Sequence, residues 1–399
     1  MPIWPRPERL LPPRLVEALA AIQSGDTSRA LELCAGLAAD DPLAGDVVRF
    51  VRGRAALGSG DRSRARRDLR RLARSDDEAL ALLATQALAD ELVARRRYAE
   101  ARPLLRRFRT SDSVTRLWLD AAVLGVDLQR HGSVPEPAVA ALEGRLERRH
   151  PPVAHAAVHV LRAERSMLAG ELAAAVQAHR TARPFVRASG DAAVARRHET
   201  VAQLLRAPFA EAEDWQEPRR PVTREDLAAL DSKPWQLWID LFHRRARRRI
   251  GRRSAPVAIE LDARGTAWDL LVPLVRSANL RLAWSQACAA LEIGDSEAGR
   301  ARAERLARDL RTAALPVRTS AEGIRLDAER FVLVFAATSL PGLSQRLVAR
   351  LASAPGATAT DLTSGDAARR TVVRHLGRLR QQGLVRMVGG GNEERYFLV

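Results

Sequence analysis

The sequence predicts a mainly α-helical protein in which an array of paired helices precedes one or two small modules of mixed α and β structure. A short turn motif recurs at intervals of 35 and 36 residues in the first half of the chain, between segments whose apolar residues have helical spacing. The last sixty residues contain three helical segments followed by two strand-like runs that glycines join. With 399 residues, the chain is long enough for two to four domains.

The repeats occupy residues 1–209. The turn at Gly25–Ala30 recurs at Gly60–Ala65, a third copy follows at Arg96–Ala101, and a later one begins at Leu168. A small residue recurs after these turns, at Ala30, Ala65, Ala101 and Ala175. The spacing and this small-residue position resemble tetratricopeptide repeats, whose unit of about 34 residues is a pair of antiparallel helices.

This resemblance implies an α-solenoid, because one helix pair cannot cover its own apolar stripe and must stack on its neighbours. A peptide or a partner helix would bind on the concave surface of such an array. The sequence also allows an array that serves only self-assembly or rigidity, since we find no aromatic or charged stripe that marks a groove.

Residues 210–254 are expected to separate the array from the modules. Ala210–Pro221 is rich in acidic residues and proline, which favours a linker. Trp235, Trp238 and Phe242 follow at the spacing of one helical face and are expected in a core. The next eleven residues hold candidate phosphate contacts, namely Arg244, Arg245, Arg247, Arg248, Arg249, Arg252 and Arg253. The alternative is a solvent-facing helix end or a linker, because blocks of like charge repel each other.

Residues 255–335 contain a strand, three helical segments and a hairpin at 317–326. This order resembles the winged helix of OmpR- and PhoB-type response regulators, which would place Arg300, Arg302 and Arg305 on the third helix. The segment is electrically neutral, with 11 basic and 11 acidic residues over 255–339, and its turn at Gly294–Ala298 echoes the repeat turns. It is therefore either a winged helix that binds DNA poorly or not at all, or a further part of the repeat array.

Residues 336–399 give the clearest pattern. Apolar residues from Leu343 to Leu351 predict a first helix that stops at Ala354–Gly356, and a second short helix is expected at 360–364. A third helix is predicted over 367–382, and Gly389–Asn392 would join two strands. The buried face of the third helix would be Val372, Leu376 and Leu379.

The run Thr371–Leu376, followed by Leu379 and Gly383–Arg386, resembles the winged helix-turn-helix regulators of the MarR and ArsR type. By that resemblance the third helix enters the major groove of DNA, and the hairpin forms a wing beside it. The residues expected to face DNA are Arg369, Arg370, Thr371, Arg374, His375 and Arg378 on the helix, with Arg386, Asn392 and Arg395 on or beside the wing.

The charge distribution supports nucleic acid as the partner more than the total charge does. The formal net charge is +17, but Lys233 is the single lysine among 65 basic residues, which suggests a biased coding composition. The excess of positive charge lies partly in residues 219–254, with 11 basic and 4 acidic residues, and in 340–399, with 9 and 4. Local concentration of arginine is typical of proteins that displace phosphate counterions.

Motifs for catalysis or cofactors are absent from the sequence. There is no glycine-rich phosphate loop ending in lysine and no nucleophile elbow. His155 and His159 share a helix face without a third metal ligand, and Cys34 and Cys288 lie far apart. No apolar run could span a bilayer, and the first residues lack a secretory signal. We therefore expect a cytoplasmic protein that is not an enzyme and has no cofactor or metal.

These features together predict a transcription regulator. Its C-terminal winged helix would bind double-stranded DNA, and its repeats would bind a protein or mediate self-assembly. A homodimer is expected, because one winged helix covers only a short half-site. The alternative is an interaction scaffold, in which repeats and winged helices bind proteins rather than DNA.

Overall fold

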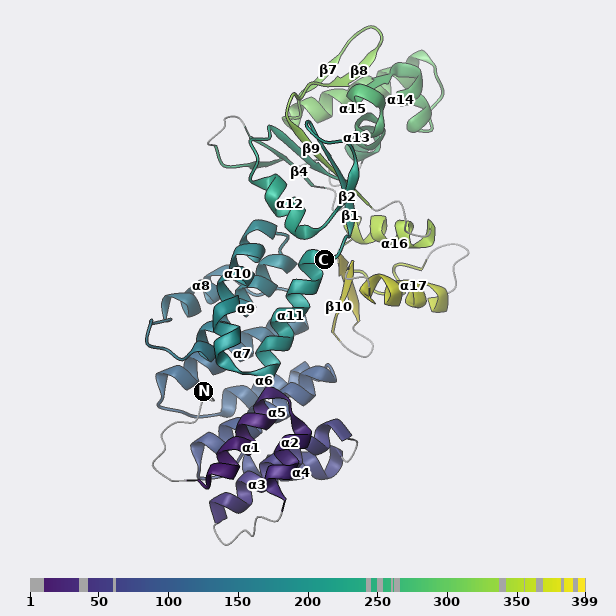
Figure 1. Ribbon diagram of the computed structural model, residues 1–399. Coiled ribbons are helices and arrows are strands. Elements are labelled where there is room, and N and C mark those ends of the chain that lie inside the picture. Colours follow the sequence, from purple (N-terminus) through teal and green to yellow (C-terminus); the bar gives the residue numbers. More distant parts are fainter. Residues whose placement is uncertain are drawn as a thin grey trace. The chain divides into compact units, whose positions relative to one another are not determined.

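The computed structural model describes residues 11–35, 42–59, 62–241, 245–249, 254–259, 261, 266–336, 342–354, 356–363, 369–381, 384–389 and 394–398. Over these residues the predicted fold class is confirmed, since an N-terminal helical array precedes a region of mixed α and β structure (Figure 1). The chain divides into two units, one of residues 1–205 with 388–394 and the other of residues 206–387 with 395–399.

The first unit is the helical array. The helices of each pair are joined by short turns and pack together, as in α1 with α2, α3 with α4 and α9 with α10. The first helices of successive pairs also contact each other: α1 contacts α3, and α3 contacts α5. The bounds are α1 (Pro13–Ser24), α2 (Thr27–Cys34), α3 (Pro42–Ser59), α4 (Arg62–Leu72), α5 (Glu78–Ala94), α6 (Tyr98–Arg107), α7 (Ser113–His131), α8 (Glu136–Gly144), α9 (Pro152–Leu168), α10 (Leu172–Ser189) and α11 (Ala192–Arg206).

Local signals in the sequence set the helix ends. The Asp26 carboxylate caps α2 by accepting a hydrogen bond from the Arg29 N–H, and Asp77 caps α5 in the same way. Gly25 ends α1 with a φ of 90°, a left-handed conformation that favours glycine. The small residues of the predicted repeat, such as Ala30 and Ala101, are fully buried. The repeat turns therefore lie between helices, as the 35-residue period indicates.

The second unit contains a six-stranded sheet with the strand order β2-β1-β9-β3-β4-β5. β3 runs parallel to β9, and β1 pairs with β9 in the antiparallel sense. One helix, α12 (Arg224–Asp231), lies in the chain between β2 and β3. The strands are β1 (Ala210–Asp214), β2 (Arg220–Val222), β3 (Leu237–Asp240), β4 (Arg245–Arg248), β5 (Val257–Ile259) and β9 (Phe331–Ala336).

The sheet corrects two predictions. The expected linker at Ala210–Pro221 forms β1 and most of β2 instead, because alternate residues of β1 are buried and pair with β9. The expected helical face around Trp238 is a strand, β3, which lies between β9 and β4. Trp235 and Trp238 are buried, as the core interpretation requires, whereas Phe242 lies outside the described residues.

A small module is inserted between β5 and β9. Its elements follow the order helix, strand, helix, helix and hairpin, and β8 lies between β6 and β7 in a three-stranded sheet. The strand expected at the start of residues 255–335 is β5, which pairs with β4 in the large sheet rather than with the module. The elements are α13 (Thr266–Arg276), a short 3-10 turn at Ala278–Leu280, β6 (Arg281–Ala283), α14 (Trp284–Ala290), α15 (Glu297–Thr312), β7 (Val317–Thr319) and β8 (Gly323–Leu326).

The inserted module shares one apolar core with the large sheet. Leu237 and Phe335 of the sheet belong to the same cluster of buried side chains as Leu271 and Leu310 of the module. Gly323 lets β8 approach β6, since a Cβ at this position would lie 2.2 Å from the Leu282 carbonyl oxygen. The module is therefore an integral part of the sheet unit.

The C-terminal segment contains two described helices and a hairpin. Two helices, α16 (Gly342–Ser353) and α17 (Arg369–Gln381), pack together, and β10 (Val385–Val388) pairs with β11 (Arg395–Leu398). A bridge between Ala357 and Tyr396 adds the position of a third strand. The second helix predicted at 360–364 is a turn over its described part, and residues 364–368 lie outside the described residues.

Within the described parts of the chain, every helix is too short or too polar to cross a lipid bilayer.

Candidate nucleic-acid interface

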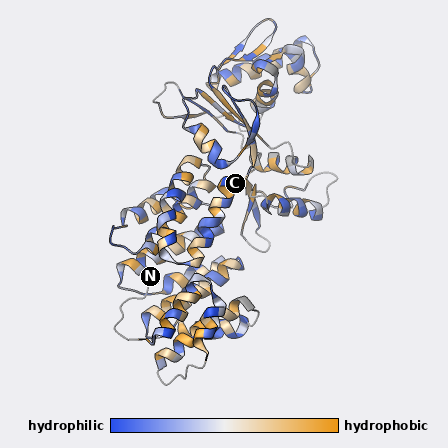
Figure 2. Ribbon diagram, in the orientation of Figure 1, coloured by the Kyte–Doolittle hydropathy of each residue, from blue (hydrophilic) through white to orange (hydrophobic). Residues whose placement is uncertain are grey.

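Helix α17 has one buried face and one basic face. Val372, Leu376 and Leu379 are at most 1 % exposed, as the sequence predicts. The opposite face is exposed and hydrophilic (Figure 2). Its arginines are Arg369, Arg370, Arg374, Arg378 and Arg380, and none of them forms an ion pair with another described residue.

The sequence of α17 contains no acidic residue, so its positive field is not neutralised along the helix. Arg370, Arg374 and Arg378 follow at intervals of four and therefore lie along one line of the helix surface. Val373, beside this line, is 43 % exposed although it is apolar. The face thus combines cations with one exposed apolar side chain.

His375 does not lie on this exposed face. It is half-buried, and a hydrogen bond of 2.9 Å joins its Nδ1 to the hydroxyl of Ser344 in α16. Burial lowers the pKa of His375, and the charges of Arg378 and Arg374 lower it further. The expectation that His375 faces the groove is therefore replaced by a role in holding α17 against α16. Thr371 is half-buried beside it.

The wing presents fewer cations than predicted. Arg395 in β11 is exposed, but Arg386 in β10 lies 5.0 Å over the ring of Phe397, and burial lowers the pKa of Arg386 to about 10. Gly389 has a φ of 88°, which fits the glycine-dependent turn that the sequence predicts. Asn392 lies outside the described residues.

In the arginine-rich segment of the large sheet, at residues 245–249, Arg247 and Arg249 contact other residues of the same unit. Arg247 pairs with Asp231 at 3.1 Å, and Arg249 donates a hydrogen bond of 3.0 Å to the carbonyl oxygen of the same aspartate. The guanidinium of Arg249 also lies 4.2 Å from the ring centre of Trp235. These two arginines contact buried tryptophans, and their interpretation as phosphate contacts stays a prediction.

Two other arginines of that segment, Arg245 and Arg248, lie among the described residues. Arg248 donates a hydrogen bond of 3.0 Å to the carbonyl oxygen of Ala314, whereas Arg245 is exposed at the start of β4. Arg244, Arg252 and Arg253 lie outside the described residues.

The inserted module carries both signs of charge on its third helix. Arg300 is 3.2 Å from Glu304 and lies 5.4 Å over the ring of Trp284. Arg302 and Arg305 are exposed, but the same helix also contains Glu297 and Asp309 at exposed positions. This mixture contrasts with the purely basic face of α17.

The first unit contains a cavity of about 520 Å³ between α1, α3, α5 and the start of α11. Apolar side chains such as Phe50 and Leu83 line it together with Arg54, Asp90 and Asp191. Asp90 is 3.3 Å from Arg54. Burial raises the pKa of Asp90, Asp191 raises it further, and Arg54 opposes this shift. The side chain of Asp90 is nevertheless 38 % exposed, as expected for a carboxylate on a concave wall.

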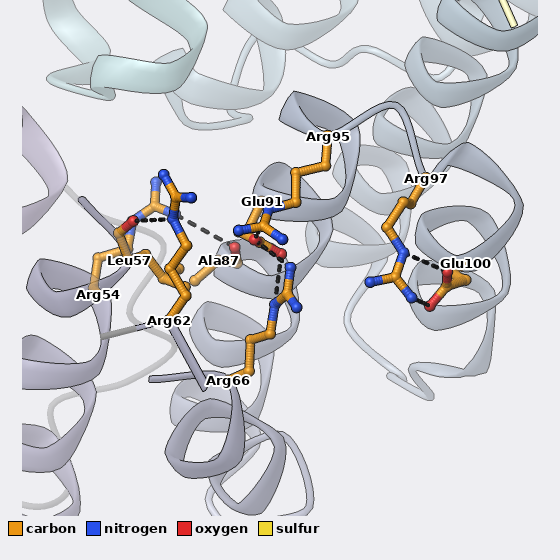
Figure 3. Close-up of polar contacts among 9 residues, drawn as sticks. All are labelled: Arg54, Leu57, Arg62, Arg66, Ala87, Glu91, Arg95, Arg97 and Glu100. Carbon is orange, nitrogen blue, oxygen red and sulfur yellow. Dashed lines mark hydrogen bonds and ion pairs between the residues drawn. The ribbon is translucent and has the colours of Figure 1, made fainter. Parts of the chain in front are cut away.

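Polar contacts join α5 to its neighbours α3 and α4. Arg66 of α4 and Arg95 at the end of α5 both contact Glu91, at 2.5 and 2.6 Å, and Arg54 of α3 donates to the carbonyl oxygen of Ala87 (Figure 3). Glu91 is only 8 % exposed, so two cations compensate one largely buried carboxylate.

The sequence interpretation missed a second basic surface, on α4 of the array. Residues 1–218 hold 34 basic and 29 acidic residues, so the nearly balanced total of this segment hides a local stripe. The signal was present as arginines at helical spacing in the segment from Arg67 to Arg74.

No protein-family model, curated protein or solved structure matches this chain.

Proposed function

We propose that this chain is a transcription regulator whose C-terminal winged helix binds double-stranded DNA. The observation that carries the proposal is the exposed face of α17, where Arg370, Arg374 and Arg378 form a line opposite a fully buried face. A helix of this kind fits the major groove, whose width admits an α-helix.

The chemistry of the face suits both parts of a DNA duplex. A guanidinium can donate two parallel hydrogen bonds to a phosphate or to the O6 and N7 atoms of guanine. Val373, exposed between the arginines, can contact the methyl group of thymine. Phosphate contacts would position the module, and contacts to base edges would select the sequence.

The other residues assigned to the interface divide by their surroundings. Arg369 and Arg395 are exposed and would contact phosphates. His375 and Arg386 would act indirectly, because each is packed against its own module. The two helices and the hairpin of the C-terminal module support the resemblance to MarR- and ArsR-type regulators, and the element order of the inserted module supports the resemblance to OmpR- and PhoB-type winged helices.

The array would receive a protein signal. Its paired helices support the resemblance to tetratricopeptide repeats, whose concave surfaces hold peptides or partner helices. The cavity beside Asp90 has apolar walls and charges of both signs, which suits an extended peptide. A homodimer would let two α17 helices read two half-sites.

The test is selection of bound sequences from a pool of random duplexes by the full-length protein, followed by a gel shift with the recovered sequences. The proposal predicts enrichment of a short shared motif that occurs as two half-sites. Recovery of unrelated sequences, with no retention of duplex at physiological ionic strength, would favour a protein-binding scaffold instead.

A further inference from the structure

Helix α4 of the array carries a stripe of arginines. Between residues 62 and 74 the chain has seven arginines and one acidic residue, Asp68. Arg67, Arg70 and Arg71 follow within α4 at the i, i+3 and i+4 spacing that places side chains on one helix face, and Arg74 follows in the turn directly after the helix end at Leu72. All four are exposed, and none forms an ion pair with another described residue. The arginine stripe consists of Arg67, Arg70, Arg71 and Arg74.

The orientation of the stripe is fixed by the packing of α4. Ala65, Leu69 and Leu72 are at most 1 % exposed and hold the opposite face against the array. Arg66, next to the stripe in sequence, turns toward α5 and contacts Glu91 (Figure 3). The stripe therefore points away from the core of the array.

Five arginines elsewhere in the array have carboxylate partners on neighbouring helices. Their guanidinium groups lie 2.5 to 3.3 Å from the carboxylates, in the pairs Arg54–Asp90, Arg66–Glu91, Arg102–Asp127, Arg145–Asp120 and Arg197–Glu164. The stripe has no such pairs, and like charges three or four residues apart repel each other. The helix dipole favours cations in the last turn, at Arg70 and Arg71, but it does not account for Arg67.

A hollow of about 720 Å³ opens beside the stripe. Its lining is Asp46, Ser63, the four arginines of the stripe, Leu72, Ser75 and Asp76. Asp46 is already paired with Arg49. Leu72 is the one apolar residue of the lining, and it is 1 % exposed. Asp76 is exposed, and the four arginines outnumber the two carboxylates of the lining. A protein partner would find no apolar floor for an anchoring side chain, so the lining suits a hydrophilic anion.

We propose that the arginine stripe of α4 binds the phosphate backbone of a DNA duplex, with the hydroxyls of Ser63 and Ser75 as additional donors. The stripe is about 10 Å long, because Arg67 and Arg74 are seven residues apart and a helix rises about 1.5 Å per residue. Each strand of a duplex presents one phosphate per about 3.4 Å of the axis, so about three phosphates of one strand fall within this length. The proposal rests on the DNA-binding function proposed above and extends it to a second surface of the chain.

The test compares full-length variants in which arginines are replaced by glutamine, a polar residue of similar helix propensity that carries no charge. The stripe variant combines Arg67→Gln, Arg70→Gln, Arg71→Gln and Arg74→Gln. The matched control removes four exposed arginines that lie far apart in the array, through Arg14→Gln, Arg106→Gln, Arg130→Gln and Arg187→Gln. Binding of a labelled duplex of unselected sequence is measured by fluorescence anisotropy between about 50 and 200 mM salt.

Loss of the stripe should reduce the slope of log affinity against log salt by about 2 to 4, because each phosphate contact contributes about 0.9. The control should change the slope by less than about 0.5. Equal slopes in the two variants would overturn the proposal. Circular dichroism checks folding, and the melting temperature of the stripe variant should stay the same or rise at low salt, since repulsion is removed.

Two further comparisons separate this proposal from that for the winged helix. If duplex binding survives Arg370→Ala with Arg374→Ala but is lost in the stripe variant, α4 is the DNA-binding surface and the function proposed for α17 fails. If labelled polyglutamate binds the wild type but not the stripe variant, while duplex binding is equal in both, the stripe binds acidic protein and the present proposal fails.

Discussion

Replacement of Arg370 and Arg374 by alanine should remove specific DNA binding while leaving the C-terminal module folded. Both side chains are exposed and form no ion pair with another described residue, so the native structure loses no visible contact. Surface substitutions of this kind change stability by within about 0.5 kcal/mol. Alanine also has the highest helix propensity, and the change removes repulsion between two cations four residues apart.

The effect on binding should be much larger. An arginine that contacts a guanine or a phosphate contributes about 1 to 3 kcal/mol, so the double variant should lose about 2 to 6 kcal/mol. At about 1.4 kcal/mol for each factor of ten, this is a reduction of affinity by about 30-fold to 20,000-fold. If both side chains contact phosphates, the salt slope should also decrease by about 2.

The assay is fluorescence anisotropy with a selected duplex and with one of unrelated sequence, together with chemical denaturation to measure the free energy of unfolding. The matched control is Arg106→Ala with Arg107→Ala, which removes two exposed arginines from the end of α6. Unchanged affinity of the α17 variant for the selected duplex would refute the reasoning. An equal loss in the control would show that total charge, rather than the face of α17, determines binding.

Three other perturbations test separate parts of the structure. Leu376→Ala in the buried face of α17 should lower the free energy of unfolding by about 2 to 5 kcal/mol, measured by denaturation, and a change below about 1 kcal/mol would place Leu376 outside the core. Arg249→Ala should lower the stability of the sheet unit, since it uncovers Trp235, but should leave the salt slope of DNA binding unchanged; a reduced slope would identify Arg249 as a phosphate contact. The pKa of His375 is lowered in the folded state, so the unfolded state binds more protons than the folded state below pH about 6.5. The free energy of unfolding of the wild type, relative to that of His375→Gln, should therefore fall as the pH is lowered from about 7 to about 5. Parallel pH profiles of these two proteins would contradict that assignment.

Short-range patterns predicted the helical parts of the fold. The turn at Gly25 and the buried Ala30 and Ala101 follow from a period that neighbouring residues define. The buried face of α17 follows from the spacing of Val372, Leu376 and Leu379. Each of these features depends on residues within about two helical turns, where periodicity is informative.

The large sheet could not be predicted in the same way. Residues 210–214 pair with residues 332–336, which lie more than a hundred positions later, and their acidic composition favoured a linker. The segment around Trp238 is too short for its apolar residues to distinguish a period of 2 from one of 3.6. Its strand conformation depends on pairing with β9 on one side and β4 on the other.

The candidate site shows the same limit. Seven arginines in eleven residues suggested phosphate contacts, but the pairing of β3 with β4 places Arg247 and Arg249 over tryptophans. His375 was assigned to the exposed face because only the contact with Ser344 reveals its burial. Conversely, the stripe on α4 was visible in the sequence and was hidden by averaging charge over the whole array.

The most direct test of the central claim is the affinity of the full-length protein for duplex DNA as a function of salt. The account predicts binding that weakens steeply between about 50 and 200 mM salt. The slope of log affinity against log salt should be about −3 or steeper, because of the line of three arginines on α17. Absence of binding at the lower salt concentration, or an affinity that does not change with salt, would contradict it.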